Sequence, residues 1–188
     1  MARPKSDDKR DAIMAAAIRV IAAQGLSAPT AMIAKEAGVA NGSLFNYFQT
    51  KSDLLNQLYI ELKTEMAAAA LEGLPTEADI REQALLMWSH WLRWATSCPD
   101  KRRTLAHLGV SDNITPENLQ AGHRIMAGVA KLLERSRENG PMRDAPLGFV
   151  VAIMSGLADA TIDFIIGDPA NADKHSAAAF DALWRIVA

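Results

Sequence analysis

The chain contains eight prolines, and all of them lie between apolar segments of helical periodicity rather than inside one. Proline lacks a backbone N–H and clashes inside a helix, so it marks where helices start and end. Between the prolines, apolar residues recur at every third or fourth position, and no segment keeps a period of two. The pattern predicts an all-α protein of about nine helices. The expected helices are 7–24, 30–37, 42–48, 51–72, 76–97, 100–110, 116–138, 147–166 and 172–187.

Capping residues support these boundaries. Thr50 and Asp53 have the spacing of a capping box, with Asp in place of the usual Glu or Gln. Thr115 stands directly before Pro116, which places a capping side chain ahead of a proline at the first helical position. The sequence therefore predicts helix starts near residues 51 and 116.

The overall composition excludes several classes of protein. Of the 188 residues, 49% are hydrophobic and 22% charged, which is too apolar for a disordered chain. One cysteine, Cys98, excludes an internal disulfide and fits a reducing compartment. The polar N-terminus does not resemble a secretory signal, and no run approaches the roughly 18–20 apolar residues of a membrane span. We expect a soluble, cytoplasmic protein without membrane association.

Charge is distributed unevenly along the chain. The net charge is −2, but residues 1–51 carry a surplus of three positive charges and the remainder carries a net −5. A mildly basic head on an acidic body is the asymmetry of a protein whose head alone meets a polyanion.

Residues 30–55 contain the most informative pattern. Ile33, Ala34 and Ala37 form one apolar helical face, and Gly38 follows where a positive φ ends the helix at little cost. A second short helix follows, for which Asn41 is a candidate cap and Leu44, Phe45 and Phe48 form the expected inward face. Two short helices joined by a tight glycine turn are typical of a helix-turn-helix, although the same spacing also fits two helices that merely pack together.

The residues of this segment resemble a known family. The run Ile33-Ala34, Ala37-Gly38-Val39, Gly42-Ser43-Leu44-Phe45-Asn46-Tyr47-Phe48, Lys51 and Leu54-Leu55 resembles the DNA-binding domain of the TetR family of bacterial transcriptional regulators, over about residues 8–56. The start Ala2-Arg3-Pro4-Lys5 and the stretch Leu58 to Lys63 are similar to the branch of RamR-type regulators of multidrug efflux. Phe45 stands where the family usually has tyrosine, which indicates a packing role.

The resemblance implies a homodimer whose recognition helices enter successive major grooves of a palindromic double-stranded operator. It implies a DNA-binding domain at residues 1–50 and a ligand-binding and dimerisation domain at residues 51–188. The helix-turn-helix would consist of three N-terminal helices, and the rest of the chain would form the helical body.

The resemblance also implies DNA-contacting residues. Thr30 would bind a phosphate, Tyr47 and Lys51 would clamp the backbone, and Arg3 and Lys5 would form a basic arm. The residues along the groove would be Asn41, Gly42, Ser43, Leu44 and Asn46. No Lys or Arg lies between Lys35 and Lys51, so the recognition helix lacks an arginine–guanine contact and would depend on Asn, thymine methyl groups and DNA shape.

Segment 147–166 is apolar almost all round, so it must be covered on two sides. Gly148, Ala152 and Gly156 make a flat stripe that permits close approach of another helix. With the last helix, this predicts a homodimer through a four-helix bundle, against the alternative of a buried core helix in a monomer. The dimer residues expected on the last helix are Phe180, Leu183 and Trp184.

Aromatic and methionine side chains are concentrated in the middle helices. Flat rings and pliable thioethers suit a pocket for apolar or aromatic effectors, and the family's effector site lies in this helical body. A ligand-free core rich in Trp and Met is the alternative for each of these residues. The expected wall residues are Tyr59, Leu62, Met66, Trp88, Trp91 and Met154.

The sequence offers little for catalysis or for a cofactor. The four histidines show no metal-ligand spacing, and neither a phosphate loop nor a nucleophile elbow appears. We therefore expect no enzyme, no catalytic residues, no metal and no cofactor. The interpretation is a repressor released from its operator by a small lipophilic effector. Its alternatives are a constitutive DNA-binding dimer and a helical ligand-binding protein that no longer binds DNA.

Overall fold

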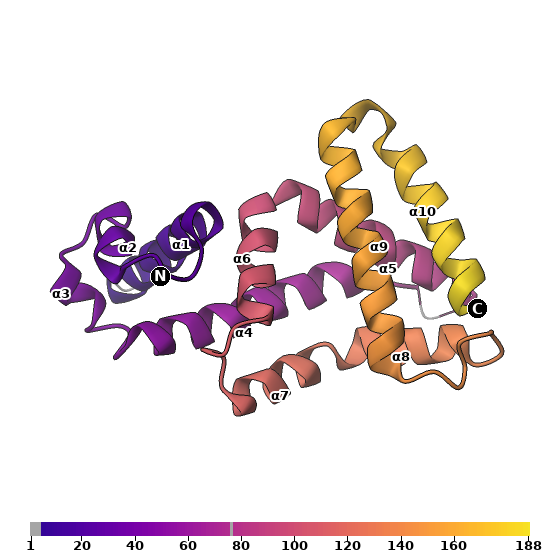
Figure 1. Ribbon diagram of the computed structural model, residues 1–188, viewed down its shortest axis with the longest axis horizontal. Coiled ribbons are helices and arrows are strands. Elements are labelled where there is room, and N and C mark those ends of the chain that lie inside the picture. Colours follow the sequence, from indigo (N-terminus) through magenta and orange to yellow (C-terminus); the bar gives the residue numbers. More distant parts are fainter. Residues whose placement is uncertain (1–4, 76) are drawn as a thin grey trace. The chain divides into compact units, whose positions relative to one another are not determined.

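The computed structural model describes residues 5–75 and 77–188, and every regular element in those ranges is a helix (Figure 1). The all-α prediction is confirmed for these residues. The elements are α1 (Lys5–Gln24), α2 (Thr30–Glu36), α3 (Asn41–Leu44), α4 (Lys51–Leu71), α5 (Ile80–Ser97), α6 (Pro99–Gly109), α7 (Pro116–Ile125), α8 (Ala127–Arg137), α9 (Leu147–Gly167), a 3₁₀ turn η1 (Pro169–Asn171) and α10 (Ala172–Val187).

Several helix starts follow the punctuation that the sequence contains. Pro116 is the first residue of α7, as predicted. At the start of α4, the Asp53 N–H donates to Thr50 Oγ1 at 3.0 Å, and the Gln49 N–H donates to Asp53 Oδ2 at 3.1 Å. The predicted capping pair therefore satisfies two N–H groups that the helix itself leaves free.

The predicted helix 116–138 is two helices in the structure. Met126 separates α7 from α8, with φ −82° and ψ 4°. No proline marks this break, but Gly122 and Gly128 lower the helix propensity on either side of it. The two halves also belong to different parts of the fold, and that difference is invisible in the local sequence.

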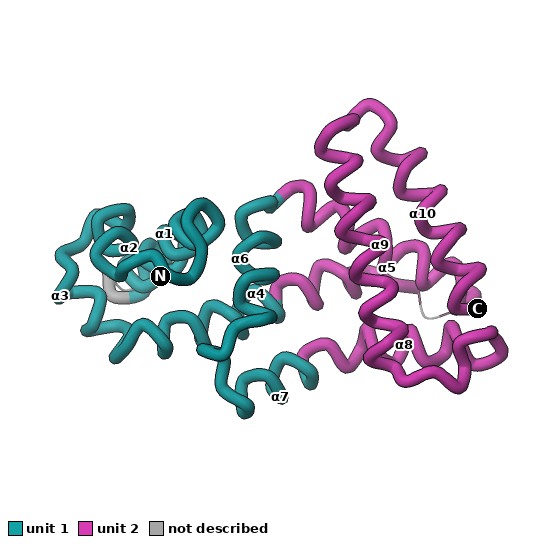
Figure 2. Tube along the Cα trace, viewed as in Figure 1, with its two compact units in different colours: residues 1–64, 98–124 teal, residues 65–97, 125–188 magenta. Residues whose placement is uncertain are grey.

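The chain forms two compact units (Figure 2). Unit 1 comprises residues 1–64 and 98–124, and unit 2 comprises residues 65–97 and 125–188. This division differs from the expected boundary at residues 50 and 51. Unit 1 includes the first part of α4, and α6 packs on α1, where the Thr104 hydroxyl donates to the Ile18 carbonyl at 3.0 Å.

Each unit has an apolar core of its own. In unit 1, Ile13, Ile33 and Phe48 are completely buried. In unit 2, Trp88, Val150 and Ala158 are completely buried. Burial of these side chains is what holds the short helices of each unit in place.

Helix α9 is strongly apolar, yet much of its surface is exposed. Its length and composition would suffice to cross a membrane, a test that core helices of soluble proteins also pass, and it alone passes among the described residues. Only 28% of its most apolar window is buried. A helix that is apolar on all sides yet poorly covered indicates a surface that another element or chain covers.

Candidate nucleic-acid interface and effector cavity

Helices α2 and α3 form a compact helix-turn-helix around Gly38. Gly38 has φ +69°, a left-handed conformation that glycine adopts without strain, as predicted. The turn is closed by Ala37 N–H to the Ile33 carbonyl and Val39 N–H to the Ala34 carbonyl, both at 2.9 Å. The second helix is shorter than the expected 42–48, since α3 ends at Leu44 and continues as a turn.

Polar and small side chains occupy the outer surface of α3. Asn41, Gly42 and Asn46 are exposed, and Ser43 and Tyr47 are half-buried. A Cβ built on Gly42 meets nothing within 4 Å, so the backbone is open to an approaching groove. These residues are accessible enough to contact bases or, for Tyr47, a backbone phosphate.

Two expectations on α3 are wrong, and they are related. Leu44 is 0% exposed, so it cannot lie along a groove and instead belongs to the core of unit 1. Phe45, expected on the inward face, is 42% exposed. On so short a helix, Leu44 and Phe48 already fill the inward side, which turns the neighbouring Phe45 outward.

Phe45 is the surface residue that sequence reasoning missed. Its apolar ring lies beside the polar residues Asn41 and Asn46, and apolar side chains in this setting can contact the methyl group of thymine. Its position directly between Leu44 and Asn46 was the available signal, because both neighbours were assigned to the groove.

The expected phosphate-binding residues occupy helix starts. Thr30 is the first residue of α2 and Lys51 the first of α4, and both are half-buried. The Lys51 ammonium donates to the Leu26 carbonyl at 2.6 Å, which fixes the side chain and leaves two N–H donors for a phosphate. Arg3 lies outside the described residues, and Lys5 begins α1 with a side chain that the structure does not describe.

A polar network connects α1 to the start of α4. Arg10 donates to Gln57 Oε1 at 3.0 Å and forms an ion pair with Glu61 at 2.5 Å. The Gln57 amide in turn donates to Asp53 Oδ1 at 3.0 Å. Asp53 belongs to the capping pair of α4, so this network positions the helix start that carries Lys51.

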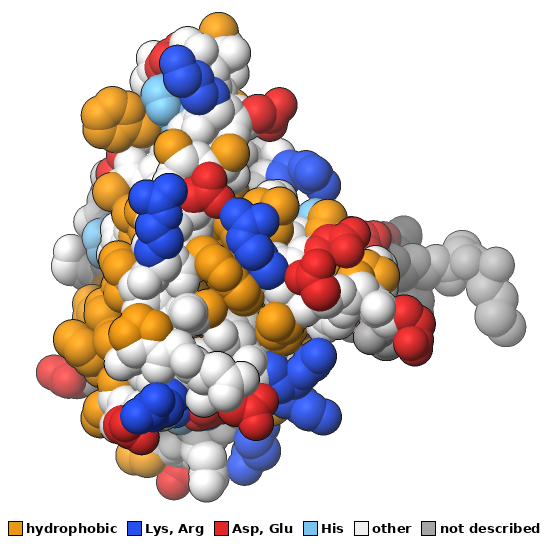
Figure 3. Space-filling model, turned by 90° about the vertical axis from the view of Figure 1, so that its right-hand side faces the viewer, with side chains coloured by type: hydrophobic (Ala, Val, Ile, Leu, Met, Phe, Trp, Pro, Cys, Tyr) orange, Lys and Arg blue, Asp and Glu red, His pale blue; other side chains and the backbone are white. Residues whose placement is uncertain are grey.

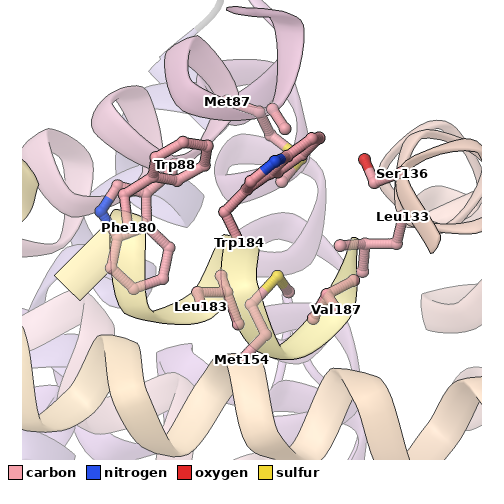
Figure 4. Close-up of a pocket in the computed structure, with 10 residues that line it drawn as sticks. Met87, Trp88, Leu133, Ser136, Met154, Phe180, Leu183, Trp184 and Val187 are labelled. Carbon is pink, nitrogen blue, oxygen red and sulfur yellow. The ribbon is translucent and has the colours of Figure 1, made fainter. Parts of the chain in front are cut away.

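Unit 2 contains a small, partly open cavity between α5, α8, α9 and α10 (Figure 4). Its volume of about 20 Å³ is enough for little more than one water molecule. Its walls are mostly apolar. The Ser136 hydroxyl already donates to the Leu132 carbonyl at 2.9 Å, and the buried indole N–H of Trp88 has no hydrogen-bond partner among the described residues. The lining residues are Ala84, Met87, Trp88, Leu133, Ser136, Met154, Phe180, Leu183, Trp184 and Val187.

Aromatic rings form one side of this cavity. Trp88 and Phe180 lie 6.5 Å apart between ring centroids, and Phe180 stacks on Trp184 at 5.9 Å. Trp91 meets Trp88 edge to face at 6.2 Å without lining the cavity. Figure 4 shows the rings extending from α5 and α10 while Met154 approaches from α9.

The expected wall residues are not all brought together. Trp88 and Met154 line the cavity, whereas Met66, also in unit 2, does not. Tyr59 and Leu62 are buried in unit 1. A Cβ on Gly122 would lie 2.5 Å from the Tyr59 hydroxyl oxygen, so this tyrosine packs closely on the backbone of α7.

Burial also changes the acidity of two groups on α4. It raises the pKa of Tyr59 and lowers the pKa of Lys63, because desolvation disfavours each charged form. The Lys63 ammonium lies 5.9 Å from the centroid of the Tyr59 ring, a contact that partly offsets the desolvation.

The expected dimer residues divide into two groups. Gly148, Ala152 and Gly156 are exposed on α9, as a contact stripe requires. Phe180 and Leu183 are buried inside unit 2, so the expectation that they face a second copy is wrong. Trp184 is half-buried and lines the cavity. The apolar face of the amphipathic helix α10 therefore packs within its own protomer.

Large apolar side chains accompany the exposed stripe of α9. Phe149 is 56% exposed, Phe164 69% and Ile166 50%. On the face of unit 2 turned to the viewer in Figure 3, hydrophobic side chains lie between charged ones. These side chains, rather than Phe180 and Leu183, make the uncovered apolar surface of the protomer.

Within residues 5–75 and 77–188, no group of three or more His, Cys, Asp or Glu side chains is arranged to hold a metal ion. The arrangement of the helices indicates the class of protein. An N-terminal helix-turn-helix with an exposed polar face, followed by a helical body, is the architecture of a helix-turn-helix transcription regulator.

Comparison with known proteins shows which family the chain resembles. Residues 13–58 match the family model of bacterial regulatory proteins of the tetR family. A crystal structure from Shewanella sp. PV-4, assigned to the same family, is 28% identical, covers 94% of this chain and 96% of its own, and has a TM-score of 0.82. The helix-turn-helix segment is therefore similar to that of the tetR family, and the fold of the chain is similar to that of a regulator of this family.

Two proteins of Bacillus subtilis are also similar. The fatty acid metabolism regulator protein is 28% identical over 131 residues, which cover 58% of this chain and 68% of that protein. The crystal structure of the transcriptional regulator FadR in complex with stearoyl-CoA is 21% identical, covers 92% of this chain and 96% of its own, and has a TM-score of 0.67. The second likeness concerns the fold.

Proposed function

We propose that this protein is a homodimeric repressor that leaves a palindromic operator when a small lipophilic effector binds. The observation that carries the proposal is the α2–α3 helix-turn-helix, with an exposed polar outer face and Lys51 fixed at the next helix start. The proposed division of labour assigns DNA binding to residues 1–50 and effector binding and dimerisation to residues 51–188. Such a protein works in the cytoplasm.

We assign base reading to Asn41, Gly42, Ser43, Asn46 and Phe45. Thr30, Tyr47 and Lys51 hold phosphates, and Arg3 and Lys5 follow the backbone as a basic arm. The helix start at Thr30 favours an anion, whereas at the capped start of α4 the Lys51 ammonium supplies the donors. Specificity depends on amide contacts and on thymine methyl groups, since α3 carries no arginine or lysine.

The effector site that we propose is the cavity of unit 2 that lies between α5, α8, α9 and α10. Its wall is mostly apolar and the Ser136 hydroxyl is already bonded, so the part of the effector that enters is hydrocarbon. A space of about 20 Å³ must widen, and Met87 and Met154 have the flexible side chains that allow this. The name of the fatty acid metabolism regulator of B. subtilis supports a fatty acyl chain as the effector.

The roles of the remaining expected wall residues and the likeness to the RamR-type branch remain predictions. Trp91 acts on the effector through Trp88, and Tyr59, Leu62 and Met66 contribute only in an opened state of the site. Likeness to the RamR-type branch would instead favour aromatic, multidrug-like effectors. The acyl-chain and aromatic hypotheses differ in a measurable way, because only the first predicts affinity that rises with chain length.

The experiment has two independent readouts. Wild-type protein selects its operator from a pool of random duplexes, and binding is measured between 50 and about 200 mM salt, where a phosphate-dependent complex loses affinity steeply. Stearoyl-CoA and the aromatic compound proflavine are then titrated against the intrinsic fluorescence of the four tryptophans, of which Trp88 and Trp184 line the cavity. Selection of a palindrome with release by either compound supports the proposal. Operator binding that neither compound changes, with unchanged fluorescence, would favour the constitutive DNA-binding dimer.

A further inference from the structure

A buried asparagine in α4 is bonded to two distant segments of unit 1. Asn56 is 6% exposed and lies on the second turn of the helix that begins at Lys51. Its Nδ2 donates to the carbonyls of Ser52 and Asn113, both at 2.8 Å. Its Oδ1 accepts the Thr115 N–H and the Asn118 amide, both at 2.9 Å. The amide thus uses two donors and two acceptor positions, which is its full capacity.

The partners of Asn56 form the entry to α7. Asn113 and Thr115 lie in the connection between α6 and α7, and Asn118 lies in the first turn of α7. Thr115 also caps this helix, since the Asn118 N–H donates to its hydroxyl at 3.3 Å. Ile114, between them, is 4% exposed. Hydrogen bonds at Asn113 and Thr115, on either side of the buried Ile114, therefore hold the start of α7 against α4.

This junction lies on the route between the two units. The chain passes from one unit to the other three times, within α4, between α5 and α6, and at the end of α7. Asn56 connects α4, which contains the first crossing, to the start of α7, which ends at the third crossing. Lys51 lies one turn before Asn56 on the same helix, and Tyr47 precedes that helix.

A saturated buried amide differs from an apolar contact at the same place. Apolar surfaces tolerate sliding, whereas four directional hydrogen bonds fix one relative position and leave costly unpaired groups in any other. We propose that Asn56 is a positioning residue that makes the start of α4 and the start of α7 move as one body, and so delivers movement of α7 to Lys51 and the reading helix. The inference rests on the proposed function, because it concerns how an effector signal reaches the operator contacts.

Hydrogen exchange on the full-length protein tests the mechanical part without any effector. In Asn56→Ala, we expect exchange at the Thr115 backbone N–H to accelerate about tenfold or more, since its acceptor, Asn56 Oδ1, is gone. The acceleration must extend to residues 47–54. Asn56→Asp keeps the acceptor for the Thr115 N–H and should recover part of the protection. Thr64→Ala is the matched control, because the Thr64 hydroxyl bonds only to the Ile60 carbonyl of its own helix.

Acceleration confined to residues 111–118 would show that Asn56 only anchors a loop, and would overturn the inference. If Asn56→Ala fails to fold, Asn118→Ala serves in its place, since it removes one of the four bonds of Asn56 together with a 3.2 Å bond to the Thr115 hydroxyl. With this variant, the expected acceleration is smaller but still reaches residues 47–54.

Operator release by stearoyl-CoA tests the signalling part. The measured quantity is the ratio of operator affinity without stearoyl-CoA to operator affinity with it. In Asn56→Ala, this ratio should fall to a third or less of its wild-type value. The operator affinity without stearoyl-CoA should change less than about threefold. An equal response in both proteins would overturn the inference and leave the proposed function intact. If stearoyl-CoA does not affect wild type, the acyl effector is refuted, and the exchange experiment alone decides the role of Asn56.

Discussion

Neighbouring residues on α3 have opposite roles. Leu44 is completely buried and Phe45 is 42% exposed, although both were expected on the same inward face. The difference arises because α3 contains only four residues and its inward side has room for few side chains. At the residue scale, adjacent positions in the chain therefore hold a core residue and an exposed residue to which we assign DNA reading.

Paired substitutions separate these roles. Leu44→Ala should lower the free energy of unfolding by about 2–5 kcal/mol, because it leaves a cavity in the core of unit 1. Phe45→Ala should leave stability nearly unchanged and relax preference at a thymine by about 1 kcal/mol. Denaturant titration and operator-variant binding measure the two effects. Loss of stability in Phe45→Ala with unchanged base preference would contradict the assignment.

Lys51 combines a structural and an electrostatic role. Lys51→Ala removes a phosphate contact, so affinity should fall for every duplex and the slope of log affinity against log salt should flatten by about one. Asn46→Ala is the contrasting variant, expected to relax preference at one base position. Binding isotherms at four salt concentrations measure both. A Lys51→Ala slope equal to that of wild type would exclude a phosphate contact.

At the scale of the element, the packing of α4 on α7 depends on a glycine. A Cβ at Gly122 would meet Tyr59 Cε1 at 2.8 Å as well as its hydroxyl oxygen, and both belong to a ring buried on all sides. A side chain there forces the ring or the helix to move. The two helices can approach this closely only because position 122 lacks a side chain.

Gly122→Ala should therefore destabilise the protein by about 1–3 kcal/mol, despite the better helix propensity of alanine. Gly109→Ala is the matched control, since a Cβ at this position of α6 meets nothing within 4 Å. Thermal unfolding of both variants measures the difference. Equal melting temperatures would mean that Tyr59 does not pack on α7 in solution.

At the scale of the whole molecule, α9 presents more apolar surface than a lone protomer covers. Phe149 and Phe164 are more than half exposed beside the stripe of Gly148, Ala152 and Gly156. The two-fold arrangement implied by a palindromic operator requires a self-complementary surface of this kind. The exposed face of α9 is the part of the described chain that offers one.

Phe164→Glu should convert the dimer to a monomer and reduce operator affinity by at least about tenfold, because both half-sites are then bound independently. Val110→Glu is the control, since Val110 is 88% exposed and belongs to unit 1, whereas α9 belongs to unit 2. Sedimentation equilibrium gives the mass of each variant. A Phe164→Glu protein that stays dimeric would place the interface elsewhere.

The sequence alone determined the features that are local in the chain. Prolines, capping pairs and the glycine turn at Gly38 act within a few residues, so the helices and the helix-turn-helix could be predicted. Amphipathic spacing also showed which residues share a face of α10. It did not show whether that face meets the same protomer or a second one.

Tertiary structure decided everything that depends on distant contacts. It turned Phe180 and Leu183 inward, since the apolar face of α10 closes a cavity against α5, α8 and α9. It joined residues 98–124 to the N-terminal head and brought Asn113 and Thr115 to Asn56. Periodicity reports which side chains point together, whereas burial depends on which segment packs against them, and only the folded chain specifies that partner.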